Sequence, residues 1–64
     1  MSDRETEVLQ LLAQGLSTKE IADRLYLSIH TVNTHRKNIM NKTDIRSLAG
    51  LTIYAVSKGI ISLD

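Results

Sequence analysis

The residues from Ser17 to Lys42 read STKEIADRLYLSIHTVNTHRKNIMNK, and this stretch decides the fold. Ser17 and Glu20 stand three positions apart and form a capping box, which marks the start of a helix. Residues 26–28 leave room only for a tight turn, after which Ser28 caps a second helix that runs to about Lys42. A short capped helix, a tight turn and a longer helix describe the geometry of a helix-turn-helix.

Both helices of this pair have an apolar face at helical spacing. The shorter helix, at about 18–25, has Ile21, Ala22 and Leu25 on one side, and the small Ala22 permits the other helix to approach closely. On the longer helix, at about 29–42, the predicted buried face consists of Ile29, Val32, Ile39 and, less centrally, Met40.

An N-terminal helix, at about 3–14, is predicted from a further capping box. Ser2 is its cap and Glu5 closes the box, while Gly15 is a natural residue for the helix end. Its buried stripe consists of Val8, Leu11 and Leu12, with Leu9 beside it.

A C-terminal helix, at about 48–58, begins after Ser47 and is stopped by Gly59. Its core side carries Leu48, Leu51 and Ala55. The chain has no proline, and no stretch alternates apolar and polar residues as a strand does. The sequence therefore predicts an all-α fold, a compact four-helix helix-turn-helix domain that comprises residues 1–64.

Length and composition limit the classes of function that the chain can have. A chain of 64 residues buries only about 60% of its unfolded surface, which leaves little room for an enzymatic pocket. Cysteine is absent, and His30 and His35 diverge around a helix, so we expect no metal site, cofactor or catalytic residue. No apolar run approaches the roughly 20 residues of a membrane span, and no signal peptide opens the chain. We therefore expect a cytoplasmic protein without membrane contact.

Positive charge is concentrated in one segment, although the net charge is only +1. Residues 28–43 contain Arg36, Lys37 and Lys42 and neither Asp nor Glu. This asymmetry indicates a polyanionic partner.

The outward side of the helix at about 29–42 has side chains suited to reading DNA. With Val32 at the centre of the buried side and about 100° per residue, the outward residues are His30, Asn33, Thr34, Lys37, Asn38 and Asn41. Asparagine pairs with adenine, lysine pairs with guanine, and the threonine methyl group contacts thymine. A solvated surface helix is the alternative interpretation, but the preceding helix and turn favour DNA contact.

Two segments, RETEVLQLLAQGLSTKEIADRLYLSIHTVNTHRKNI (4–39) and LAGLTIYAVSKGII (48–61), together resemble a known family. They are similar to the DNA-binding domain of LuxR-type (NarL/FixJ) bacterial transcription regulators, and the resemblance covers almost the whole chain. The family pattern GLS.KEIA..L..S..TV..H...I is matched without a gap. Thr43 departs from the leucine that the family usually has, and Met1-Ser2 stands in place of Leu-Thr.

The resemblance implies roles for individual residues. The third helix of such proteins enters the major groove, and their base-contacting positions correspond here to Asn33, Thr34 and Lys37. His30 is a further base-contact candidate. Contacts to backbone phosphates, which fix register rather than sequence, are implied for Lys19, Ser28, Thr31, His35 and Lys42.

Three residues leave alternatives open. Arg36 projects close to the core side, so it either reaches outward to a phosphate or pairs with Glu5 or Glu7. His35 is expected to be partly buried and to bond a phosphate or a backbone group. Tyr26 occupies a turn position where glycine is common, and whether it takes a positive φ is undecided.

A second apolar stripe on the C-terminal helix indicates a dimer. Ala49, Thr52, Ile53 and Val56 follow the spacing i, i+3, i+4, i+7 on the side opposite the core. Apolar residues scattered over a surface are the alternative. We favour a two-fold dimer interface, which the resemblance also implies, and expect it to be weak without DNA or a second domain.

The predicted function is sequence-specific binding of double-stranded DNA, as the output domain of a bacterial transcription regulator of the response-regulator type. A homodimer is expected on inverted half-sites. The resemblance also implies an N-terminal receiver or ligand-sensing domain in the full-length protein and RNA polymerase as a further candidate partner. The rival from another class is a protein-interaction module that docks through the helix at 48–58.

Overall fold

The computed structural model describes residues 1–62, and no strand occurs within this range. Its helices are α1 (Asp3–Ala13), α2 (Thr18–Leu25), α3 (Ile29–Thr43) and α4 (Leu48–Ser57). The all-α four-helix fold is thus confirmed, and each helix bound lies within one residue of the range expected from the sequence. No helix among these residues has the length and apolar character needed to cross a membrane.

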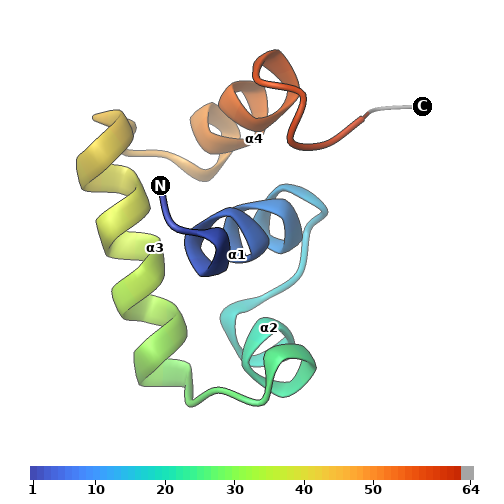
Figure 1. The fold of residues 1–64 in the computed structure, drawn as a ribbon, viewed down its shortest axis with the longest axis vertical. Coiled ribbons are helices and arrows are strands. Elements are labelled where there is room, and N and C mark those ends of the chain that lie inside the picture. The colour runs from blue at the N-terminus through green and yellow to red at the C-terminus, as the bar shows by residue number, and fades with distance from the viewer. Residues whose placement is uncertain (63–64) are drawn as a thin grey trace.

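Helix α1 lies at the centre of the molecule (Figure 1). It packs against α2, α3 and α4, and α2 packs in addition against α3. Helices α2 and α4 lie on opposite sides of α1, while α3, the longest helix, runs along one edge of the molecule. One long side of α3 is therefore left uncovered by other helices.

Each helix begins after a serine whose hydroxyl accepts a hydrogen bond from the backbone N–H three residues later. These serines are Ser2, Ser17, Ser28 and Ser47. In α1 and α2, Glu5 and Glu20 accept a hydrogen bond from the N–H of the cap residue in return, so both capping boxes are confirmed. These bonds satisfy backbone donors that a helix start leaves unpaired, and they fix where each helix begins.

Every helix contributes one large aliphatic side chain that has no exposed surface: Leu9, Ile21, Ile39 and Leu51. Burial of such a side chain stabilises the fold by roughly 1.5–3 kcal/mol. Val32 is also fully buried. Because Val32 and Ile39 both lie on α3, their burial fixes which side of this helix faces inward.

The predicted placement of four apolar residues was wrong in detail. Leu9 lies at the centre of the core rather than beside the buried stripe, and Leu11 is only partly buried. Ile29 and Leu48 were placed inward, but they are 46% and 50% exposed. Both are the first residues of their helices. A helical wheel gives the direction of a side chain, but not whether another element lies beside it at that level.

Tyr26 ends α2 in the left-handed conformation, with φ 57° and ψ 43°, which decides the question that the sequence left open. The next N–H, that of Leu27, donates to the carbonyl oxygen of Ala22 at 2.9 Å. The left-handed region costs an L-residue roughly 1–2 kcal/mol. The Tyr26 side chain is 95% exposed, so its packing does not offset that cost. The turn is nevertheless short enough to hold α2 and α3 as a helix-turn-helix.

Candidate nucleic-acid interface

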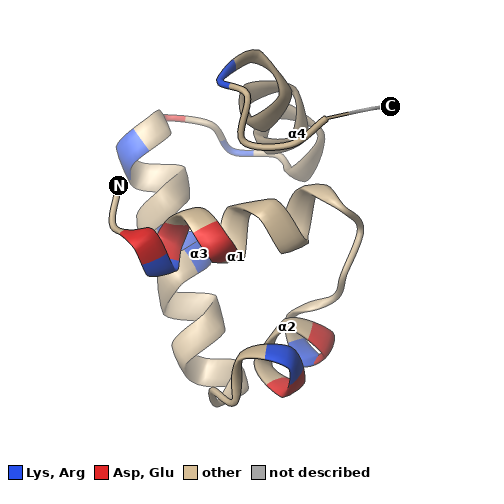
Figure 2. Cartoon of the chain, turned by 45° about the vertical axis from the view of Figure 1, so that its right-hand side comes forward, with Lys and Arg blue, Asp and Glu red and all other residues tan. Residues whose placement is uncertain are grey.

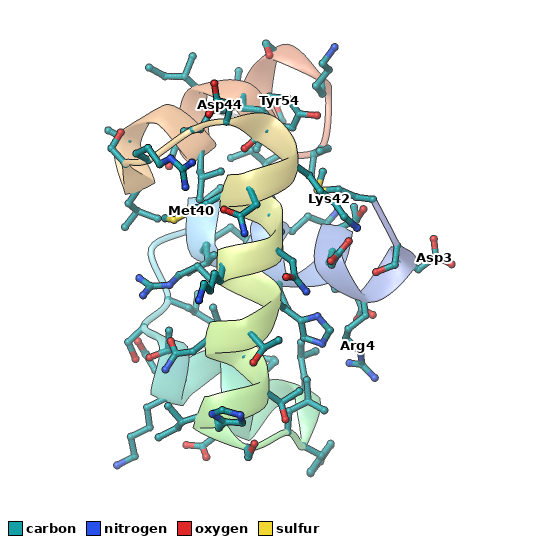
Figure 3. The ribbon with its side chains drawn as sticks, turned by 90° about the vertical axis from the view of Figure 1, so that its left-hand side faces the viewer. Asp3, Arg4, Met40, Lys42, Asp44 and Tyr54 are labelled. Atoms are coloured by element: carbon teal, nitrogen blue, oxygen red, sulfur yellow. The ribbon has the colours of Figure 1, made fainter. Side chains whose placement is uncertain are left out.

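Helix α3 presents one exposed polar side, which we call the outer face. It consists of His30, Asn33, Thr34, Lys37, Asn38 and Asn41, all of them exposed as expected. Figure 3 views the molecule with α3 in front, from the side that no other helix covers. Because Val32 and Ile39 are buried on the opposite side, the outer face has a fixed direction.

Hydrogen bonds within the outer face decide which polar groups remain free for a ligand. The Thr34 hydroxyl donates to the backbone oxygen of His30 at 3.1 Å, so Thr34 offers a methyl group and an acceptor but no donor. The Asn41 amide oxygen accepts a hydrogen bond from Arg46 at 3.2 Å. Side chains of the outer face that have no hydrogen bond or ion pair in the described part of the chain include Asn33, Lys37 and Asn38.

Ser28 and Thr31 lie together at the N-terminal end of α3. The Ser28 hydroxyl accepts the N–H of Thr31 at 3.0 Å, and the two hydroxyl oxygens are 2.9 Å apart in a second hydrogen bond. Ser28 is exposed and Thr31 is partly buried. Free N–H groups and the helix dipole favour anions at this end of a helix. The pair is therefore placed where a phosphate group would be favoured.

Lys19 and Arg36 are exposed cations that form no ion pair within residues 1–62. Of the two alternatives for Arg36, the pairing with Glu5 or Glu7 is wrong. Glu5 binds Lys42 instead, and Glu7 lies 3.9 Å from Arg4. The long side chain of Arg36 carries its charge into solvent.

Lys42 is held by a buried acid. Its ammonium group donates to the Glu5 carboxylate at 2.7 Å, and the Glu5 side chain is only 6% exposed. The hydrogen bond from Lys42, helped by one from the Ser2 N–H, holds the pKa of Glu5 below its ordinary value of 4.5, although burial acts in the opposite direction. In Figure 3, Lys42 extends toward the N-terminal turn of α1, where Asp3 and Arg4 are labelled. Lys42 therefore ties α3 to α1.

His35 is partly buried, as expected. Its Nδ1 atom is buried and has no hydrogen-bond partner among the described residues, so the alternative of a backbone partner for this nitrogen is wrong. The other ring nitrogen, Nε2, has no hydrogen-bond partner among the described residues either. Within residues 1–62, no group of three or more acidic, histidine or cysteine side chains could hold a metal ion.

Charge is distributed unevenly among the elements (Figure 2). Helices α1 and α2 carry acids and bases, α3 carries only bases, and α4 carries no charged residue. Between α3 and α4, Arg46 is 70% exposed and contacts the outer face through Asn41. Sequence reasoning did not single out Arg46, because it lies beyond the helix and a helical wheel cannot show a contact across a turn.

The apolar stripe of α4 lies on the side of the helix opposite the core. Ile53 is 70% exposed, Ala49 is exposed, and a shallow apolar hollow is lined by Thr52, Ile53, Val56 and Ser57. The Thr52 hydroxyl donates to the backbone oxygen of Leu48 at 3.1 Å, and the Ser57 hydroxyl donates to that of Tyr54 at 2.9 Å. Because both hydroxyl hydrogens turn back to the helix, the hollow presents carbon to solvent.

Comparison of the sequence with known proteins identifies the family of the chain. Residues 1–55 match the family model described as bacterial regulatory proteins, luxR family. The chain is 46% identical over 63 residues to the uncharacterized response regulatory protein YgeK of Escherichia coli (strain K12), which covers 98% of this chain and 43% of that protein. It is 41% identical over 61 residues to the oxygen regulatory protein NreC of Staphylococcus haemolyticus (strain JCSC1435) and of Staphylococcus carnosus (strain TM300).

The two NreC proteins are matched over 95% of this chain and 28% of their own length, so the chain spans less than half of each of these relatives. The family match includes both helices of the helix-turn-helix. The resemblance inferred from the sequence is thereby confirmed. The chain belongs to the luxR family of bacterial regulatory proteins, as a DNA-binding helix-turn-helix domain of transcription regulators.

Proposed function

We propose that the chain binds double-stranded DNA in a sequence-specific manner, with α3 in the major groove. The main support is the outer face, which is exposed, rich in amides and hydroxyls, and free of carboxylates. A helix fits the major groove of B-form DNA. A side without acids also avoids repulsion by the phosphates.

Base edges are contacted by Asn33, Thr34 and Lys37, with His30 as a fourth candidate. The free amide of Asn33 can pair in bidentate fashion with adenine, and Lys37 can donate to the acceptor edge of guanine. Thr34, whose hydroxyl hydrogen is engaged by its own helix, offers its methyl group to thymine. The hydrogen bond of Thr34 thus favours a methyl contact at its position, while the side chains of Asn33 and Lys37 remain unpaired among the described residues and available to bases.

Phosphate contacts are assigned to Lys19, Ser28, Thr31, His35, Arg36 and Lys42. Lys19 and Arg36 are unpaired cations in the described residues, and His35 has Nε2 available. Lys42 is 52% exposed, so its remaining ammonium hydrogens can reach a phosphate while Glu5 holds one. These contacts fix the register of α3 on the duplex.

Dimerisation on DNA is assigned to the α4 stripe of Ala49, Thr52, Ile53 and Val56, which borders the apolar hollow. A two-fold axis through this stripe would place two α3 helices about one helical turn of DNA apart, roughly 34–36 Å, on inverted half-sites. The stripe comes from a single short helix, which agrees with a weak interface.

The role of residues 1–64 in a longer protein is also a proposal. We take these residues as one output domain of a response regulator in a two-component system, because one of the matched relatives is named a response regulatory protein. The same relatives are more than twice as long as the chain. A receiver or ligand-sensing domain would then precede it, and RNA polymerase would be contacted at promoters.

The assignment of the outer face is tested by Lys37→Ala and Asn33→Ala. We expect each variant to lose about 1–3 kcal/mol of specific affinity and to relax preference at one base pair. Lys58→Ala removes the same charge at the far end of α4 and serves as the matched control. Affinity is measured by fluorescence anisotropy on specific and scrambled duplexes. Parent-like binding by both outer-face variants would show that the face is assigned wrongly.

A further inference from the structure

The linker between α3 and α4 supplies a cation to the outer face. We propose that Arg46 binds a DNA phosphate at the C-terminal end of this face and that Asn41 holds the Arg46 guanidinium in place. The inference rests on the proposed function, which it deepens by adding a contact from outside the helix-turn-helix.

The position of the guanidinium follows from its contact with α3. Arg46 Nη1 donates to Asn41 Oδ1 at 3.2 Å. Asn41 follows Lys37 by one turn on the same side of α3, a rise of about 6 Å. Asp44 ends the helix in the left-handed conformation, with φ 56°, and this turn brings residue 46 back beside Asn41. The guanidinium thus lies beside Asn41, at the end of the row formed by Thr34, Lys37 and Asn41 on the outer face.

Most of the hydrogen-bonding capacity of Arg46 remains unused. Its side chain is 70% exposed, and Nη2 lies 3.8 Å from an Asp44 carboxylate that is itself 92% exposed. A pair this long between solvated groups adds little to stability, so a phosphate can displace it. A guanidinium has five N–H donors in a planar fork, which matches phosphate in bidentate fashion.

A phosphate is the expected partner rather than a base edge. In helix-turn-helix docking, the N-terminal residues of the recognition helix contact bases, while the C-terminal end of the related homeodomain helix contacts the DNA backbone. Arg46 lies three residues beyond Thr43, the last residue of α3. Lys42, the other cation near this end, has its charge balanced by buried Glu5, whereas within residues 1–62 Arg46 pairs only with the exposed Asp44 at 3.8 Å.

The salt dependence of DNA binding tests this role. The logarithm of the association constant falls with the logarithm of salt concentration by about 0.9 for each phosphate contact in B-form DNA. We expect Arg46→Gln to reduce this slope by about one unit and to weaken binding roughly tenfold near 0.1 M salt, equally on all sequences. Arg46→Lys should retain the slope and lose a fewfold in affinity, because the charge stays and the fork is lost.

Asn41→Ala should likewise keep the slope and weaken binding a fewfold, since it removes only the anchor of the guanidinium. Arg4→Gln on α1, whose arginine is 43% exposed and also lies beside an acid, is the matched control and should leave the slope unchanged. Circular dichroism verifies that each variant is folded.

An unchanged slope in folded Arg46→Gln would overturn the inference, and so would a loss of preference at one base pair, which indicates a base contact. If the unsubstituted chain binds no duplex at low salt, the proposed function itself fails and this inference fails with it. Failure of the proposed function can be distinguished from failure of the Arg46 inference alone, because it is seen with the unsubstituted chain before any variant is compared.

Discussion

At the scale of single residues, the carboxylate of Glu5 joins two distant parts of the chain. It accepts the N–H of Ser2 at 3.1 Å and so closes the capping box of α1, and it binds the ammonium group of Lys42 on α3 at 2.7 Å. The carboxylate is almost fully buried, whereas Lys42 is half exposed. Removing the lysine would therefore leave a buried charge without its partner.

We expect Lys42→Met to lower the free energy of unfolding by about 1–2 kcal/mol at neutral pH, a value reduced from that of a fully buried pair because the lysine is half exposed. The folded-state pKa of Glu5 lies below 4.5, so its contribution is complete above that value and is lost as the pH falls through the folded-state pKa. The difference between parent and variant should therefore vanish in acid.

Urea unfolding of both proteins, at neutral pH and well below the folded-state pKa of Glu5, measures this difference. The pKa of Glu20 is also lowered, by the hydrogen bond from the Ser17 N–H, but that contact is the same in both proteins and its effect cancels. A stability gap that persists unchanged in acid would mean that the Glu5–Lys42 bond is not its source.

The same residues show what the sequence could predict. Ser2 and Glu5 are three positions apart, so the backbone geometry of a helix start alone brings them together, and their pairing was predicted correctly. Glu5 and Lys42 are 37 positions apart, and only the packing of α1 on α3 makes them neighbours. Because the sequence does not show how α1 packs on α3, Glu5 is predicted as a candidate partner of Arg36 rather than of Lys42. The contact of Arg46 with Asn41 also depends on the folded chain, so the sequence does not single out Arg46.

At the scale of the helices, stability depends on side chains that fill the space around α1. Leu9 of α1 has no exposed surface, whereas Leu48 at the start of α4 is half exposed. The sequence pattern placed Leu48 in a buried stripe and Leu9 only beside one, because periodicity reports the direction of a side chain and not the proximity of a neighbouring helix. The two leucines therefore form a matched pair for testing the packing.

Leu9→Ala should lower the free energy of unfolding by about 2–5 kcal/mol, through lost burial and the cavity that remains. That is a large part of the roughly 3–10 kcal/mol expected for a chain of this length. Leu48→Ala should cost less than about 1 kcal/mol. Chemical denaturation followed by circular dichroism compares them, and equal losses would contradict the position of Leu9 at the centre of the core.

Gly50 lies in the first turn of α4 and allows the linker to pack closely. A Cβ atom at this position would lie 2.7 Å from Cγ2 of Ile45 and 3.1 Å from Oγ of Ser47. In an unobstructed helix, alanine is more stable than glycine by about 1 kcal/mol. Here the added carbon meets a branched side chain that is partly buried and has few alternative rotamers.

We therefore expect Gly50→Ala to destabilise the chain by about 1–3 kcal/mol despite the better helix propensity. In a background with Ile45→Ala, which removes the obstructing methyl group, the same substitution should be neutral or stabilising. Thermal unfolding of the parent, the two single variants and the double variant gives the coupling free energy between positions 45 and 50. A rise in stability for Gly50→Ala alone would show that the linker does not pack as described.

At the scale of the whole molecule, the outer face of α3 and the apolar stripe of α4 are available at the same time. Helix α3 lies along one edge of the molecule, and the stripe of α4 points away from the core side marked by Leu51 and Ala55. The luxR family membership and the fold could be inferred from the chain itself, because capping boxes, turn and periodicity are local patterns. The DNA sequence that the domain binds is not encoded in any such local pattern of the protein chain.

Ile53→Asp should reduce cooperative binding to a duplex with two inverted half-sites while binding to a single half-site survives, because it places a charge in the apolar stripe. Gln14→Glu adds the same charge at an exposed position of the α1 end and is the control. Electrophoretic mobility shifts on both duplexes provide the comparison. Cooperativity equal to that of the parent would rule out α4 as the dimer interface and leave it open to another protein partner.

The most direct test of DNA reading by α3 is selection from a random pool of duplexes, carried out with the unsubstituted chain and with Lys37→Ala at two salt concentrations. We expect the unsubstituted chain to enrich a short half-site at both concentrations, and Lys37→Ala to enrich the same half-site with one base pair relaxed. Failure to enrich any sequence at low salt, or identical enrichment by the two proteins, would contradict the role of the outer face.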